Sequence, residues 1–257
     1  MTDIYEGGIS ISTFGVGDDF DKDLMVNVAD VAGGSFYFIT TAADIPKFIE
    51  QEFQGLLTTA AYNIEVAWQK IEGVQIRRAL GVPYEDRLSN NTKMGDLRSG
   101  NELLIILDVT MPPIKNEERE IEAVTFNVQW VPRSGSTEPI HLKPISCNIS
   151  YTTDEKLLTM EDDHILENVH LLEAAFVQYE AMAMADHGDF SGAQQTMNMF
   201  QEKLNRKISQ TGSANLQRLQ AQNVQMLNDV LSEEKYTKTG HKKLRSSIYD
   251  LRKRRSS

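Results

Sequence analysis

The chain has 257 residues, enough for one large domain or for two to three small ones. Hydrophobic residues make up 40% and charged residues 25%, as in ordinary soluble globular chains. No apolar run approaches the ~18 residues that a bilayer-spanning helix needs. Residues 1–6 lack the basic and apolar regions of a secretory signal, so we expect a cytoplasmic protein. A lone cysteine, Cys147, excludes a disulfide framework and a cysteine-type zinc site within one chain.

The charge is unevenly distributed along the chain. The net charge of −11 argues against broad nucleic-acid binding. Between Lys235 and Ser257, nine lysines and arginines stand against one acid, so this segment carries +8 and the rest of the chain −19. Any attraction to phosphate or anionic lipid must therefore come from this segment, which we call the basic tail.

The first 57 residues alternate short strands with helical patterns. A β-rich run at 8–17 ends in glycines, and apolar residues at helical spacing follow from Leu24 to Ala29. A second strand is predicted at 35–40, and a helix follows with Asp44 as its N-cap. Such a β-α-β-α order predicts parallel strands.

The region 58–153 has a different pattern. Apolar residues alternate at 64–68, 123–130 and 145–151, and 103–109 forms a continuous apolar run. Clusters of Gly, Pro and Asn separate these segments, and helical spacing is missing. The pattern predicts an antiparallel β-sandwich.

The region 154–234 has helical periodicity. One apolar face runs through 165–179, a second through 190–208 and a third through 216–230, with breaks between them. Two or three helices joined by short loops are predicted to pack as antiparallel hairpins. The sequence thus predicts an α+β multidomain chain with four zones: 1–57, 58–153, 154–234 and 235–257.

The N-terminal zone resembles a known domain. The run 8–17 with Gly15-Val16-Gly17, the helix from Asp19 to Leu24, the segment 29–39 and Ala43-Asp44-Ile45-Pro46 match four successive elements in order and spacing. Together, Ile9–Phe53 is similar to the closing part of von Willebrand factor A domains, over about a fifth of the chain. The later zones look like the regions that often follow this domain in large adhesion-type proteins, and the turn 185–193 is typical of them.

The resemblance does not extend to the family's metal site. In the family that site begins with Asp-x-Ser-x-Ser, which occurs nowhere in this sequence. The nearest match begins at Asp189 but has Ala193 in the last position, and it lies at a helix start where Asp and Ser serve as caps. No metal ligand can be carried over. The resemblance therefore implies a truncated domain whose two strands leave an unpaired sheet edge and an uncovered apolar face. A shortened gene model, a missing half supplied by another chain, or a different packing of Ile9–Ile39 would each account for it.

Two patterns in the N-terminal zone invite a ligand interpretation. Asp19, Asp21 and Asp23 resemble the opening of a calcium loop, but the glycine of the sixth position is Leu24. Acids at a helix start are more simply explained by the helix dipole. The turn Gly15–Gly17 is placed as in a dinucleotide site, but it lacks a third glycine and nearby acids would repel a pyrophosphate.

No catalytic grouping is recognised elsewhere. The sequence contains no His-x-x-x-His pair and no evident combination of base and nucleophile. The acids at 161–163, before His164, are predicted to start a helix. Cys147 alternates with Ile145 and Ile149 and is predicted to be a small buried residue. We therefore expect no cofactor, no metal and no enzymatic activity.

The basic tail has two clusters of cations, predicted as contacts with a partner or a membrane: Lys242, Lys243, Arg245, Arg252, Lys253, Arg254 and Arg255. Leu244, Ile248 and Leu251 share one helical face between these clusters. Such a helix can bind an anionic membrane, a partner groove or an import receptor. Alternatively, it packs back onto the protein through its three apolar residues.

The sequence therefore predicts a non-enzymatic interaction or scaffold protein without its own metal-ion-dependent adhesion site. Its partner would be another protein, and the unpaired strand edge could support self-association. Two alternatives remain. One is a fragment of a ubiquitin-ligase-like protein whose RING module lies upstream, and the other is a peripheral membrane protein held by the basic tail.

Overall fold

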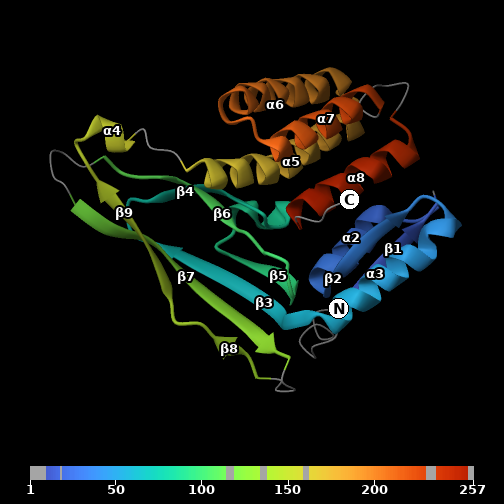
Figure 1. Cartoon of the computed structure of the whole chain (residues 1–257), viewed down its shortest axis with the longest axis horizontal. Helices are drawn as coiled ribbons and strands as arrows, with labels where there is room; N and C mark the ends of the chain where they lie inside the picture. Colours follow the sequence, from blue (N-terminus) through green and yellow to red (C-terminus); the bar gives the residue numbers. More distant parts are fainter. Residues whose placement is uncertain are drawn as a thin grey trace. The chain divides into compact units, whose positions relative to one another are not determined.

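The structure is a computed structural model that describes residues 10–17, 19–113, 119–133, 138–158, 162–229 and 236–253. Helices and strands both contribute, which confirms the mixed α and β character predicted from the sequence (Figure 1). The chain divides into two compact units that interleave in sequence. Unit 1 comprises Met1–Phe14, Asp23–Tyr37 and Ala43–Glu161, and unit 2 comprises Gly15–Lys22, Phe38–Ala42 and Asp162–Ser257.

The N-terminal zone has the predicted β-α-β-α order. Its elements are β1 (Ile11–Val16), α2 (Lys22–Val31), β2 (Gly33–Ile39), the short 3-10 helix η1 (Ala42–Asp44) and α3 (Ile45–Leu57). The amide of Ile11 donates to the Ala32 carbonyl and that of Gly17 to the Ile39 carbonyl. Since the partners advance together along both strands, β1 and β2 are parallel. Within the described residues these two strands form a sheet of their own.

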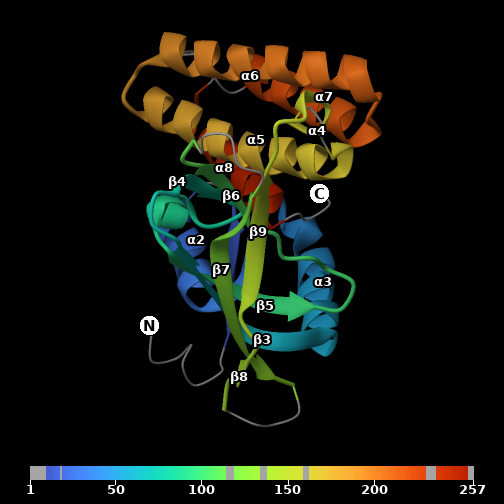
Figure 2. The same cartoon turned by 90° about the vertical axis from the view of Figure 1, so that its left-hand side faces the viewer.

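The next zone contains two antiparallel sheets (Figure 2). The larger sheet has the order β5-β3-β7-β8, and β9 also pairs with β7. Its strands are β3 (Thr59–Lys70), β5 (Asn91–Arg98), β7 (Arg119–Pro132), β8 (Ile140–His141) and β9 (Ile145–Tyr151). The smaller sheet pairs β4 (Gln75–Leu80) with β6 (Ile106–Thr110), and the 3-10 helix η2 (Tyr84–Leu88) lies between β4 and β5.

Side chains from both sheets share one core. Trp68 of β3, which is 1% exposed, is buried with Ala79 of β4 and Val124 of β7, and Leu107 of β6 packs against them. A second cluster lies on one face of the larger sheet, where Ile64 and Met94 are buried and Val66, Val128 and Trp130 pack against them. The side chains that alternate with these residues along β3 and β7 lie on the opposite face of the sheet.

The C-terminal zone is helical. A short helix α4 (Glu155–Leu158) is followed by α5 (Asp163–Asp186), α6 (Phe190–Thr211), α7 (Ala214–Asp229) and α8 (Lys238–Arg252). The side chain of Asp162 accepts hydrogen bonds from the backbone amides of His164 and Ile165. The side chain of Asp189 accepts a hydrogen bond from the backbone amide of Gly192. These bonds confirm the predicted helix starts.

Helices α5, α6 and α8 share a core in unit 2. Leu244 and Ile248 of α8 are buried against Met182 of α5 and Met197 of α6. Gln178 of α5 donates to Asn223 of α7 at 2.8 Å and accepts a hydrogen bond from Ser247 of α8 at 3.0 Å. The fully buried Gln178 thus joins three helices through polar contacts.

Candidate interaction surfaces

Helix α3 presents an apolar face to solvent. Ile49, Phe53, Leu56 and Leu57 are exposed by 54%, 61%, 45% and 52%. They are spaced at i, i+4, i+7 and i+8, so they form one stripe along the helix. We call these four residues the α3 stripe. Helices of globular proteins normally turn such a stripe toward the core.

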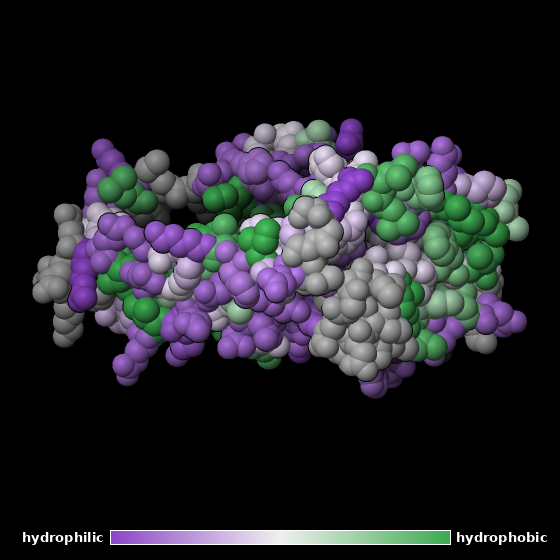
Figure 3. Space-filling model, turned by 90° about the horizontal axis from the view of Figure 1, so that it is seen from below, coloured by the Kyte–Doolittle hydropathy of each residue, from purple (hydrophilic) through white to green (hydrophobic). Residues whose placement is uncertain are grey.

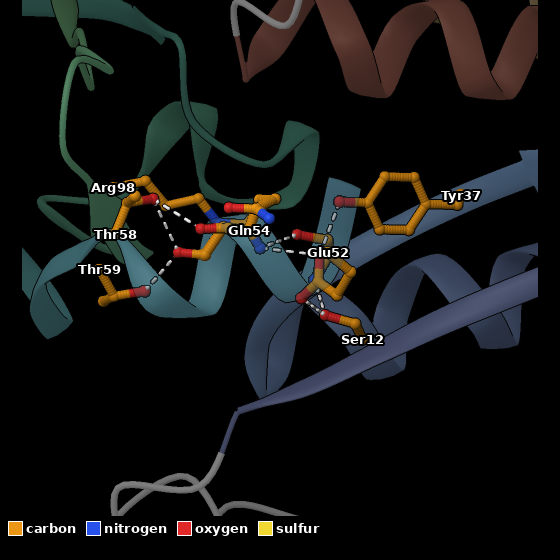
Figure 4. Close-up of polar contacts among 9 residues, drawn as sticks. Ser12, Tyr37, Glu52, Gln54, Thr58, Thr59 and Arg98 are labelled. Carbon is orange, nitrogen blue, oxygen red and sulfur yellow. Dashed lines mark hydrogen bonds and ion pairs between the residues drawn. The ribbon is translucent and has the colours of Figure 1, made fainter. Parts of the chain in front are cut away.

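The inward side of α3 instead carries a charge. Glu52 is 8% exposed and accepts hydrogen bonds from Ser12 Oγ at 2.5 Å, Tyr37 Oη at 2.6 Å and Arg98 Nη2 at 2.8 Å (Figure 4). Arg98 Nη2 also donates to Ser35 Oγ at 3.2 Å. The carboxylate thereby receives donors from β1, β2 and β5, and it ties α3 to these three strands.

The electrostatics of this cluster favour the ion pair. Burial by itself would raise the pKa of Glu52, but the hydrogen bonds from Ser12, Tyr37 and Arg98, together with the Arg98 charge, outweigh it, so the pKa is lowered. Burial likewise opposes the charge of Arg98, yet its bond to Glu52 and the charge of that carboxylate raise the pKa of Arg98. Both groups are therefore charged near neutral pH, and each satisfies the other.

A glycine near the end of α3 leaves space for the ion pair between Glu52 and Arg98. Gly55 lies three residues after Glu52 on α3, and a Cβ atom at Gly55 would fall on the Arg98 guanidinium. Thr58 and Thr59 close the helix by donating their hydroxyls to the Gly55 carbonyl, each at 3.1 Å. The fixed Glu52 contact thus sets the rotation of α3, and that rotation places the α3 stripe in solvent.

The two-stranded sheet has a strand edge without a paired neighbour among the described residues. Among the described residues β1 pairs with β2 alone, so the other edge of β1 has no strand partner there. Leu24 and Val31 of α2, exposed by 56% and 42%, are further exposed apolar residues of unit 1, but they are not part of the α3 stripe. Figure 3 shows hydrophobic surface gathered on the right-hand side, which is where Figure 1 places α3. An exposed apolar stripe such as that of α3 is typical of a protein-binding site.

A groove of about 910 Å³ lies elsewhere in unit 1. Its floor crosses four strands, because strand register places Lys93 (β5), Glu65 (β3), Gln129 (β7) and His141 (β8) side by side in one row. Glu65 accepts a hydrogen bond from Gln129 Nε2 at 2.7 Å and forms a salt bridge with Lys93 Nζ at 3.4 Å. The neighbouring row on the same face contains Asn91, Ala67 and Asn127.

The walls of the groove come from three other segments. Asn27, Asp30 and Val31 belong to the second half of α2, and the remaining wall residues follow β4 or β8: Pro83, Glu85, Asp86, Leu142 and Pro144. Asp86 accepts a hydrogen bond from Thr92 at 2.8 Å. The groove is therefore polar along its floor and partly aliphatic along its walls.

The acids predicted as a calcium loop or helix cap lie at the start of α2. Asp19, Asp21 and Asp23 are all exposed, and Asp23 lies in the first turn of the helix. In the described part of the chain, no three His, Cys, Asp or Glu side chains converge as a metal site would require. Of the turn Gly15–Gly17, Gly17 has a φ of +68°, a left-handed conformation that glycine adopts without strain.

The histidines are dispersed, and Cys147 is not where it was predicted. His164 is exposed, whereas His170 is buried with its Nδ1 3.5 Å from Glu173. Cys147 is exposed, so the prediction of a buried residue is wrong. It lies on β9, whose residues 145–148 are all exposed. Neither face of this part of the strand is therefore covered among the described residues, which the alternating pattern alone does not show.

Helix α8 carries the described part of the basic tail. Lys242 and Arg245 are buried, with Lys242 Nζ 3.9 Å from the centre of the Phe20 ring and the Arg245 guanidinium 5.2 Å from that of Tyr179. Of the five predicted contact residues that the structure describes, only Lys243 is exposed; Arg252 and Lys253 are half-buried. Arg254 and Arg255 lie outside the described residues. Contact with a membrane or partner through this set stays a prediction. None of the described helices is long and apolar enough to cross a membrane.

Comparisons with known proteins bear on the fold. A scan against protein-family models found no match. The uncharacterized protein YfbK of Escherichia coli K12 is 26% identical over 114 residues, which are 41% of this chain and 20% of that protein. Among solved structures, a von Willebrand factor type A protein from Catenulispora acidiphila matches 98% of this chain and 60% of its own, with a TM-score of 0.65 and 16% identity.

Two further solved structures are similar. The ArnB paralog VWA2 from Sulfolobus acidocaldarius matches 94% of this chain and 55% of its own, with a TM-score of 0.50 and 17% identity. The human COPII-coat protein Sec24c matches 96% of this chain and 33% of its own, with a TM-score of 0.54 and 11% identity. This chain therefore spans a fifth of its E. coli relative and less than two thirds of each structure. Its fold is like that of von Willebrand factor A proteins, as the N-terminal zone predicted.

Proposed function

We propose that this chain is a non-enzymatic protein-interaction module of von Willebrand factor A-like fold, and that it binds its partner through the α3 stripe. The observation that carries the proposal is the orientation of α3, which buries the charged Glu52 and exposes Ile49, Phe53, Leu56 and Leu57. Burying one such apolar side chain is worth about 1.5–3 kcal/mol. A partner that covers the stripe would therefore gain substantial free energy.

The partner we propose is another protein with an apolar surface that fits the stripe. The open edge of β1 would allow the same partner to add a strand to the two-stranded sheet. The family's metal motif is missing from the sequence, so this binding is proposed to be independent of a metal ion.

The non-enzymatic role is supported by the chemistry of the described side chains. The Glu52–Arg98 cluster combines burial with shifted pKa values, which can mark an active site. Each of its charges is already satisfied, however, by Ser12, Tyr37 and the opposite charge. Such a cluster supports a structural role.

Site-specific photo-crosslinking tests the proposal. A photoreactive amino acid is placed at Phe53, within the stripe, or at Gln51, which is exposed on the opposite side of α3, in the cells that produce the protein. We expect a discrete protein adduct from position 53 and none from position 51. The adduct partner is then purified, and Phe53→Asp should weaken its binding by about tenfold or more. Equal adducts at both positions, or none, would contradict the proposal.

A further inference from the structure

We propose that the groove across β5, β3, β7 and β8 is a second binding site, and that it takes a short peptide segment bearing a lysine or arginine. This site does not depend on the α3 stripe. It stands on the volume of the groove, about 910 Å³, and on the residues that strand register brings into it. A volume of this size accommodates a ligand of several residues.

The floor offers hydrogen bonds suited to a peptide backbone. Asn91, Asn127 and Gln129 present side-chain amides, which both donate and accept, as backbone amides do. In the described part of the chain, the side chains of Asn91 and Asn127 make no hydrogen bond, and Asn127 is half-buried. Ala67 lies between them in the same row, and its short side chain leaves space above the sheet.

The charge of the lining selects a cation. Among the described lining residues, four carboxylates, those of Asp30, Glu65, Glu85 and Asp86, stand against one ammonium group, that of Lys93. The chain as a whole has a net charge of −11, which adds to the attraction of a basic ligand. An anionic ligand would meet repulsion from both sources.

The aliphatic walls fit the rest of such a side chain. Val31 and Leu142 are each 42% exposed, and Pro83 and Pro144 lie in the same lining. Lysine and arginine bury their methylene stems along apolar surface while the charged end reaches a carboxylate. A peptide residue of this type would thus use the walls and the acids together.

A capped octapeptide library provides the test. The immobilised full chain is incubated with the library, and bound peptides are sequenced, with spermidine as a competing free cation. We expect enrichment of lysine and arginine over aspartate and glutamate, and binding that spermidine alone does not abolish. Absence of this enrichment, or complete displacement by spermidine at equal concentration, would overturn the proposal of a peptide site.

Variants then locate the bound peptide. The most enriched peptide is titrated against Asn127→Ala and Ala67→Trp, of which the first removes an amide and the second fills the groove. Each should weaken binding by about tenfold, while Asn101→Ala, at an exposed turn residue outside the groove, should leave it unchanged. If Ala67→Trp prevents folding, Asn127→Ala decides alone. Unchanged binding in Asn127→Ala would place the peptide elsewhere and overturn the inference.

Discussion

A single buried carboxylate determines which face of α3 meets solvent. Glu52 receives three side-chain donors, and its ion pair with Arg98 joins residues 46 positions apart. Rotating α3 to bury the α3 stripe would remove Glu52 from these donors and leave Arg98 without its counter-ion. Because an unpaired buried charge costs several kcal/mol, the exposed stripe is the more stable arrangement for this chain alone.

Replacing one partner of this pair should destabilise unit 1 strongly. We expect Glu52→Ala to lower the free energy of unfolding by about 3–5 kcal/mol, since Arg98 would remain buried without a counter-charge. Urea denaturation followed by circular dichroism measures the change. The matched control is Glu50→Ala, an exposed glutamate on the same helix, which should cost under about 1 kcal/mol. Equal losses in the two variants would show that the pair contributes little.

The same carboxyl should make stability depend on acid pH. The pKa of Glu52 is lowered from its ordinary value of 4.5. Its stabilising contribution is therefore fully present above pH 4.5 and is lost as the pH falls through the lower pKa of the folded state. Unfolding midpoints measured from about pH 6 to about pH 3 should fall more steeply for the natural chain than for Glu52→Gln. Parallel curves for the two proteins would contradict this assignment.

At the scale of single elements, the sequence predicts helix α3 but not which of its apolar residues are exposed. The spacing of Ile49 and Phe53 is local, so it can be seen in the sequence. The partner of Glu52, Arg98, lies on β5, and no local pattern connects the two. Likewise, no local pattern predicts the row of residues across the floor of the groove, because the register of four strands brings these residues together.

The sequence predicts the apolar face of helix α8, and the structure shows what this face packs against. Leu244 is fully buried in the core with α5 and α6. Leu244→Ala should therefore lower the free energy of unfolding by about 2–5 kcal/mol, through lost burial and the cavity that remains. Met199→Ala, at a residue of α6 that is 64% exposed, is the matched control and should change stability by less than about 1 kcal/mol. A small effect of both substitutions would show that α8 does not contribute to the core.

At the scale of the whole molecule, the two proposed binding sites differ in chemistry. The α3 stripe is apolar and uncharged, whereas the groove is lined by carboxylates and amides. Binding at the groove should therefore weaken as salt rises, and binding at the stripe should change little. Both sites belong to unit 1, while the buried side chains of unit 2 mainly serve its own helical core.

The exposed stripe should also make the isolated chain associate with itself as its concentration rises. Apolar surface without a partner drives such contacts, and the open edge of β1 can add strand pairing to them. We expect the weight-average mass from sedimentation velocity to rise with concentration for the natural chain. The double variant Ile49→Ser/Phe53→Ser should remain monomeric over the same range. The matched control, Leu88→Ser/Met199→Ser, removes two residues that are 71% and 64% exposed outside the stripe, and it should associate as the natural chain does. If the two double variants behave alike, general hydrophobicity rather than the α3 stripe would account for the association.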